Sequence, residues 1–349
     1  MMIAAARNPI IRAASGISAP SFFGRIAIVA TLGLVPFLTA AEIHVDPALP
    51  GFAPSSPLTG NISATGDDDM QSLMESWETL FNQSYPSVTV RLDVSSSAKA
   101  GQNLAAGAEM AFVGRKLLDD ELAIVTHAWG YPPTLVVVAG GSYDDKDMTH
   151  AEMVWVNPAN PIRGLTLAQL DAIFGEERKR GAPRAVKTWG DLGLTGDWAD
   201  KLVHAFRHRS VGVTQFINEV VLKNGPWRKD VSVLDKAKEV PPLVARDKYA
   251  IGLAGIGFAK SVDVRAVPIS PSADQSFVAP TLENVANRSY PLSRVIYIYV
   301  NKPPGAPITP LVREFLRAIL SKDGQEAALH EGFLPLSCDL ANVELAKIN

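Results

Sequence analysis

The stretch Thr65-Gly-Asp-Asp-Asp-Met-Gln-Ser-Leu-Met74 joins a predicted strand to a predicted helix. Polar and apolar residues alternate over 61–65, which is typical of a strand, and apolar residues recur at helical spacing over 70–81. A loop between the carboxyl end of a strand and the start of a helix is where α/β proteins bind ligands, often anions. We expect Gly66 to make the turn and an aspartate to cap the helix, although such a cap needs no ligand.

The composition is that of an ordinary globular protein. The chain has 349 residues, 47% hydrophobic and 20% charged, which is enough for two lobes with a core each. The formal net charge is −3, and without the three arginines before residue 42 it is −6, from 30 basic against 36 acidic residues. We therefore expect no nucleic-acid binding. Cys338 is the only cysteine, which excludes an internal disulfide and a thiolate metal cage.

The first 41 residues have the layout of a secretory signal. Arg7, Arg12 and Arg25 precede an apolar run over 26–38, and small residues follow at 39–41. This layout predicts a cleaved signal peptide over 1–41 and a periplasmic or secreted mature protein, with an uncleaved anchor as the alternative. Four prolines within 42–58 predict an extended leader.

Strand and helix patterns alternate through the rest of the chain. This alternation predicts an α/β fold whose sheet is mainly parallel and whose crossovers are right-handed. The pattern predicts further strands over 88–94, 110–113, 134–139, 153–156 and 295–300, and helices over 99–107, 165–174 (capped by Thr166), 215–223 and 310–321.

Two motifs that could indicate other chemistry are weak. No helix pattern follows the glycines of 252–257, so they indicate a strand and turn rather than a dinucleotide site. His204 and His208 are four residues apart, but the local pattern favours a strand over a helix, so we expect neither a metal site nor a cofactor. The sequence contains no Walker motif and no nucleophile elbow, and we expect no enzyme activity.

Three loops each follow a predicted strand and precede a predicted helix. They are the acidic turn at 66–69, the serines at 95–97 and the segment 207–214. A serine-rich turn at a helix start offers hydroxyls and free N–H groups to an anion, and Arg207 and Arg209 could add a bidentate fork. The three loops together indicate an anion-binding cleft, while helix capping alone remains the alternative.

Several further stretches match one family. They are Phe81-Asn-Gln-Ser-Tyr-Pro86, Thr188-Trp-Gly-Asp-Leu-Gly-Leu-Thr-Gly196, and residues 157–174, 249–258 and 290–299. With them, the sequence resembles the phosphate-binding, periplasmic-type substrate-binding proteins of ABC importers from about residue 61 to 336. The resemblance is closest to the branch whose first loop reads Gly-Ser-Asp-Thr-Met, where this chain has Gly66-Asp-Asp-Asp-Met70.

The resemblance implies a periplasmic binding protein of type II, an α/β fold with two mixed-sheet lobes joined by hinge strands. It places the first lobe at 59–138 and 262–349 and the second at 139–261. It implies a monomer that captures a small, phosphate-like oxyanion between the lobes, closes on it, and docks on an ABC permease in the membrane.

The resemblance also implies a ligand set, from which this chain departs. Asp67 and Asp69 stand where the family has Ser and Thr, Gly114 where it has Ser, and Val211, Gly212 and Val213 where it has Ser-Gly-Thr after Arg207. We therefore expect weak phosphate binding. The candidate ligand-binding residues are Asp67, Asp68, Asp69, Ser95, Ser96, Ser97, Gly114, Arg115, Arg207, Ser210, Gly212 and Thr214.

Two alternatives remain at this point. One is a module of the same fold that no longer takes phosphate and recognises a cationic or metal-bridged ligand, or acts as an envelope interaction protein. The other is a secreted α/β hydrolase, against which the missing nucleophile elbow argues.

Overall fold

The computed structural model describes residues 42–348. The predicted signal peptide lies outside these residues. Residues 42–59 contain no helix or strand, and Val45 and Leu49 of this segment are buried against Ala341. Within 42–348, no helix combines the length and the apolar character that crossing a membrane requires.

The first lobe is built on a five-stranded mixed sheet. β1 pairs in parallel with β2 and β3, while β12 lies antiparallel between β3 and β4. The order is β2 (Val88–Ser95), β1 (Gly60–Asp67), β3 (Met110–Val113), β12 (Val295–Val300) and β4 (Thr134–Gly140).

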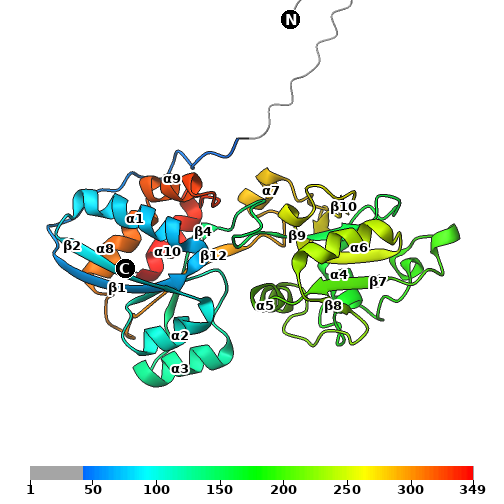
Figure 1. The fold of residues 1–349 in the computed structure, drawn as a ribbon, viewed down its shortest axis with the longest axis horizontal. Helices are drawn as coiled ribbons and strands as arrows, with labels where there is room; N and C mark the ends of the chain where they lie inside the picture. Colours follow the sequence, from blue (N-terminus) through cyan, green and yellow to red (C-terminus); the bar gives the residue numbers. More distant parts are fainter. Residues whose placement is uncertain (1–41, 349) are drawn as a thin grey trace, which may run out of the picture. The chain divides into compact units, whose positions relative to one another are not determined.

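Helices cover both faces of this sheet (Figure 1). The side chains of β3 alternate between the two faces, because Met110 and Phe112 pack in one hydrophobic cluster and Ala111 and Val113 in another. On the first face lie α1 (Gln71–Ser84), α8 (Pro310–Ile319), α9 (Lys322–His330) and α10 (Cys338–Ile348), and on the second α2 (Ser97–Ala105) and α3 (Asp119–Trp129).

The second lobe has a five-stranded mixed sheet and a two-stranded sheet. The larger one has the order β10 (Arg265–Ala266), β5 (Glu152–Val156), β9 (Ala250–Gly255), β7 (His204–His208) and β8 (Ser232–Leu234). The smaller one pairs β6 (Leu165–Thr166) with β11 (Ile269–Ser270). The helices are α4 (Leu167–Phe174), α5 (Val211–Val220), α6 (Val240–Arg246) and α7 (Leu282–Ala286), with short 3₁₀ turns at Trp189–Leu192, Gly196–Trp198, Ala237–Glu239 and Ile256–Phe258. A further 3₁₀ turn, Asp68–Met70, lies in the first lobe between β1 and α1.

The expected fold class is confirmed, since both lobes are α/β with mixed sheets. The helix starts agree with the predictions where a cap was recognised: the Thr166 hydroxyl accepts from the Gln169 N–H at 3.1 Å and opens α4. α5 begins at Val211, four residues before the predicted start, because the Ser210 hydroxyl caps it by accepting from Val213 N–H.

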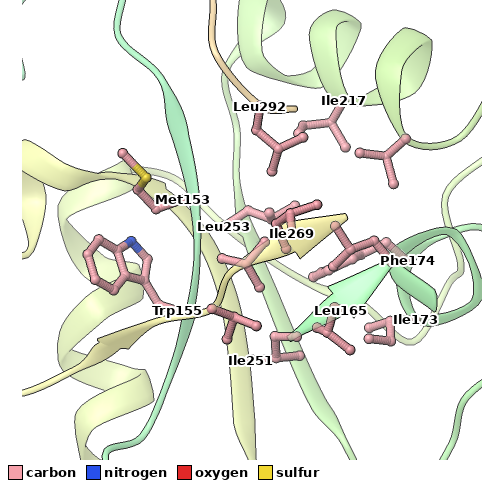
Figure 2. Close-up of a cluster of buried hydrophobic side chains, with 14 of the residues drawn as sticks. Met153, Trp155, Leu165, Ile173, Phe174, Ile217, Ile251, Leu253, Ile269 and Leu292 are labelled. Atoms are coloured by element: carbon pink, nitrogen blue, oxygen red, sulfur yellow. The ribbon is translucent and has the colours of Figure 1, made fainter. Parts of the chain in front are cut away.

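The chain returns to the first lobe later than predicted. β10 pairs with β5 and β11 with β6, and Val285, Tyr290 and Leu292 pack in the second-lobe core. Figure 2 shows Ile269 and Leu292 among the side chains of that core. We therefore place the second crossing near Arg294 instead of residue 262. β10 and β11 have two residues each, which is too short a run for the sequence pattern to indicate the strands with which they pair.

The expectation that Gly66 makes the first turn is wrong. Gly66 lies inside β1 without a positive φ. A Cβ at this position would lie 2.7 Å from the Met74 side-chain end and 3.2 Å from the Phe112 Cβ. The glycine is therefore needed for the close packing of α1 against the sheet.

Replacing Gly66 by alanine should accordingly destabilise the protein by about 1 kcal/mol, the low end of the usual cost of overpacking a core, because the end of the Met74 side chain can move aside while the Phe112 Cβ cannot. Gly51→Ala is the matched control, because the added Cβ would meet only Asp323 Oδ2 at an ordinary 3.4 Å. Urea denaturation of both variants measures the difference. Equal stability of the two would contradict the packing argument.

Candidate ligand-binding cleft

The loops that follow β1, β2 and β3 meet the start of α5 around a cavity of about 530 Å³, here called the cleft cavity. Strand ends and helix starts gather donors and charges at such places. The lining comes from Asp67 and Asp69, from residues 96–98, 114–115, 146–150 and 208–213, and from Asp235, Ala237, Phe258 and Arg294.

Eight of the twelve predicted site residues line the cleft cavity. They are Asp67, Asp69, Ser96, Ser97, Gly114, Arg115, Ser210 and Gly212. Of the other four, Asp68 is exposed and Ser95 has a buried hydroxyl without a partner. Arg207 and Thr214 line a different cavity of about 870 Å³ beside α5.

Asp67 binds the start of α2. Its two carboxylate oxygens accept from the backbone N–H and from the hydroxyl of Ser97. A helix N-terminus with a serine is an oxyanion site, and here a carboxylate of the same lobe fills it. Neither Asp67 nor Met70 caps the helical segment that follows it by a side-chain hydrogen bond, so the expected aspartate cap of α1 is wrong.

The surroundings of Asp69 disfavour the ionised form of its carboxyl group. Burial, followed by the charges of Asp67 and Asp68, raises the pKa of its carboxyl to about 6 against the opposing effects of Arg294 and the Thr149 N–H. One of its oxygens is buried without a hydrogen-bond partner. The first loop therefore presents carboxylates, which at neutral pH only accept hydrogen bonds.

Gly114 makes room for a hydroxyl from elsewhere in the chain. A Cβ on Gly114 would lie 2.0 Å from Thr149 Oγ1, so Thr149 occupies the space that a serine side chain at 114 would need. Thr149 lies on the segment that connects the two lobes after β4. The resemblance places a serine hydroxyl at position 114, and in this protein the Thr149 hydroxyl occupies that space instead.

Arg115 lines the cleft cavity, but its charge is already compensated. It is 8% exposed and forms two 2.7 Å hydrogen bonds to the carboxylate of Glu121 in α3. A buried bidentate pair of this kind holds a loop in place. Arg115 is therefore a structural residue of the first lobe.

The structure places Arg207 outside the cleft cavity. Its guanidinium stacks over the Trp227 ring at 4.4 Å and donates to Thr214 Oγ1 at 3.3 Å. Burial, followed by the charge of Arg209, lowers the pKa of Arg207. Arg209 lines the cleft cavity but is exposed and pairs with Asp235 at 3.4 Å.

Sequence reasoning missed Arg294, an arginine that lines the cleft cavity. It precedes β12 and donates to the Gly114 carbonyl at 2.9 Å. Burial lowers its pKa, while Glu152, Tyr297 and Asp69 oppose that shift. Arg294 lies in the matched stretch 290–299, but nothing in that pattern distinguishes a ligand arginine from one at a strand start.

Sequence reasoning also missed His150 and Glu152, and it weighed His208 only as the partner of His204. His150 and His208 line the cleft cavity and are 7% and 6% exposed, and Glu152 is fully buried. Their Nε2 atoms lie 3.6 and 3.9 Å from the two oxygens of Glu152. His204, the other half of the histidine pair weighed from the sequence, is exposed and contacts Asp247 at 2.6 Å.

A family model for the PBP superfamily domain matches residues 52–323. The chain belongs to this superfamily. A phosphate-binding protein PstS from Pseudomonas aeruginosa is 37% identical over 311 residues, which is 88% of this chain and 93% of that protein. This similarity confirms the predicted resemblance to the phosphate-binding, substrate-binding proteins.

Solved structures agree in fold. PstS from Borrelia burgdorferi superposes with a TM-score of 0.55 at 18% identity, covering 79% of this chain and 98% of that one. An ABC-type phosphate transport receptor from Vibrio cholerae gives 0.51 at 18% identity, covering 79% and 100%. At such identities the similarity supports the architecture alone.

The raised pKa of Asp69 predicts a pH-dependent effect of Asp69→Asn. Because the pKa of Asp69 is about 6 in the folded protein and the ordinary value for an aspartate is 3.8, ionisation opposes folding as pH rises through this window. The neutral amide should stabilise the fold by about 1–2 kcal/mol at pH 7.5, below the full value of about 3 because solvent screens part of the charge, and by almost nothing near pH 4.

Melting temperatures at the two pH values test this prediction. Asp68→Asn, at the exposed neighbour in the same cluster, is the control and should shift little at either pH. A gain for Asp69→Asn that is as large at pH 4 as at pH 7.5 would show that charge is not the cause.

Proposed function

We propose that this protein is an exported solute-binding protein that captures a small oxyanion in the cleft cavity for an ABC importer. The observation that carries the proposal is the position of Arg294, whose guanidinium lies in a cavity between strand ends of both lobes, opposite the start of α5. Gly212 keeps that helix start open, with Arg294 Nη2 3.2 Å from where its Cβ would be. An arginine and a helix N-terminus are both anion donors.

The relatives support the ligand class and the partner. The Pseudomonas aeruginosa protein is named for phosphate binding, and the Vibrio cholerae one is an ABC-type phosphate transport receptor. By analogy, this protein acts in the periplasm as a monomer and by binding, without catalysis of its own. Ligand contacts from both lobes stabilise a closed form, which docks on a membrane permease.

Phosphate itself should bind weakly. Asp67 already uses the N–H and hydroxyl of Ser97, and Asp69 adds a second negative charge. Two unit charges about 4 Å apart repel by about 4 kcal/mol at an effective dielectric constant of 20. That energy corresponds to about three decades of affinity.

The double change Asp67→Ser/Asp69→Thr should therefore tighten phosphate binding by at least tenfold at pH 7.5, because it frees the donors of Ser97 and removes both charges. Calorimetric titration of the purified mature protein measures the affinity. Binding by the unmodified protein should also strengthen as pH falls below 6, where Asp69 becomes protonated. Sub-micromolar binding that the double change does not improve would refute this account.

Arg294, rather than Arg207, should be the anion-binding arginine. Removing one partner of a buried charge pair costs about 2–5 kcal/mol, so Arg294→Ala should weaken phosphate binding by roughly 30-fold or more. Arg207→Ala is the matched control and should leave the affinity unchanged. Both are measured in the Asp67→Ser/Asp69→Thr background, where binding is easiest to detect. The opposite ranking would move the site to the cavity beside α5.

A further inference from the structure

The cavity beside α5 is larger than the cleft cavity and adjoins it. The two measure about 870 and about 530 Å³, and they share Arg209, Ser210 and Val211 in their walls. A free inorganic oxyanion near Arg294 would fill only a small part of this space, since pockets of about 300–1,000 Å³ hold drug-sized ligands. The cavity beside α5 is therefore large enough for a further part of the same ligand.

Two contacts between the lobes hold the walls of this cavity together. Gln215 Nε2 of α5 donates to the Leu117 carbonyl at 3.3 Å. Lys116 Nζ lies 2.5 Å from Glu219 Oε1, also of α5. Both contacts join α5 to the segment that precedes α3, so the two sides of the cavity are fixed next to each other.

The wall from the second lobe is rich in groups that both donate and accept hydrogen bonds. Its hydroxyl and carboxamide side chains are those of Ser210, Thr214, Gln215, Asn218 and Asn224. Hydroxyl and carboxamide groups can pair with a ligand hydroxyl in either direction, because each offers a donor and an acceptor. Arg207 adds a guanidinium, which only donates. This wall therefore suits a ligand that carries several hydroxyl groups.

Two polar atoms of this wall have no hydrogen-bond partner within residues 42–348. They are Nε of Arg207, a donor, and Oδ1 of Asn218, an acceptor, and both are buried. Buried polar groups are nearly always hydrogen-bonded, because an unpaired one costs free energy. Since both side chains line the cavity, a small rotation of each brings these atoms to a ligand there. A hydroxyl group offers what both atoms need.

The wall from the first lobe is mainly apolar. Leu117, Leu118 and Leu122 line it, together with Tyr299, whose hydroxyl accepts from the Leu117 N–H at 3.0 Å. Val211, at the start of α5, is 59% exposed and adds apolar surface where the two cavities meet. A carbon skeleton can pack against such a wall while its hydroxyl groups face the polar side.

We propose that the ligand is a phosphate monoester of a polyhydroxylated alcohol, of the sugar phosphate class, whose organic part lies in the cavity beside α5. Its hydroxyl groups contact Arg207 and Asn218, and its carbon skeleton packs on the leucines opposite. The phosphoryl group lies at Arg294 and the start of α5, and this half of the inference rests on the proposed function. The organic part supplies affinity that free phosphate lacks in a site whose first loop presents carboxylates.

The test is calorimetric titration of the purified mature protein with glucose 6-phosphate, methyl phosphate and inorganic phosphate at pH 7.5. The same titrations are made on Asp67→Ser/Asp69→Thr, in which inorganic phosphate should bind measurably. Glucose 6-phosphate should bind roughly tenfold or more tightly than the other two, because only it brings hydroxyl groups into the cavity beside α5.

Asn218→Ala and Arg207→Ala should each weaken this preference and leave the affinity for inorganic phosphate unchanged. Alanine is a better helix former than asparagine, so Asn218→Ala should fold. Asn342→Ala is the matched control, because Asn342 is exposed on α10 outside both cavities and should change neither affinity. Arg294→Ala should weaken the binding of all three compounds.

Equal affinity for the three compounds overturns the inference, and it leaves oxyanion capture standing if Arg294→Ala weakens their binding. A preference for glucose 6-phosphate that survives both Asn218→Ala and Arg207→Ala also overturns it, since the organic part would then lie elsewhere. Phenyl phosphate that binds as tightly as glucose 6-phosphate refutes the role of the hydroxyl groups. If none of these compounds binds to either protein, the inference and the proposed function both fail.

Discussion

The contact between Asp67 and Ser97 constrains the first lobe's half of the cleft. α2 begins at Ser97, and the free N–H groups of a helix start attract negative charge. Because Asp67 ends β1 and β1 pairs with β2 up to Ser95, the carboxylate lies beside that helix start by the register of the sheet. The Asp67 carboxylate thus occupies the place of a bound oxyanion at this helix start. An external anion has to displace it from the N–H and the hydroxyl of Ser97.

The sequence predicted most of the fold because both lobes show clear periodicity. β3, predicted over 110–113, is found there without change, and the alternation of Met110 and Phe112 with Ala111 and Val113 is the pattern that reveals it. The late return to the first lobe could not be predicted in the same way. It depends on β10 and β11, strands of two residues whose partners lie about 100 residues earlier, at β5 and β6.

The residues of the candidate site likewise fall into those that the sequence predicted and those that it did not. Residues at strand ends and helix starts, such as Asp67, Ser97 and Gly212, were found because a strand-loop-helix pattern marks them. Arg207 and His208 show the limit: successive residues of a strand point to opposite faces, so one position decides which side chain enters the cleft cavity. Here it is His208 that lines the cavity, while Arg207 stacks on Trp227. Periodicity alone cannot fix that choice where the strand is short and amphipathic.

Three of the missed groups lie on the segments that connect the lobes. Thr149 and His150 belong to the first connection and Arg294 to the second, and the two connections are joined by the Gly141 N–H donating to the Arg294 carbonyl at 2.8 Å. Arg294 therefore links the second connection to the loops that line the cleft cavity. Because Arg294 also donates to the Gly114 carbonyl, neutralising its charge changes a contact between that connection and the first lobe. The anion proposed for the cleft thus meets a connection between the lobes at this side chain.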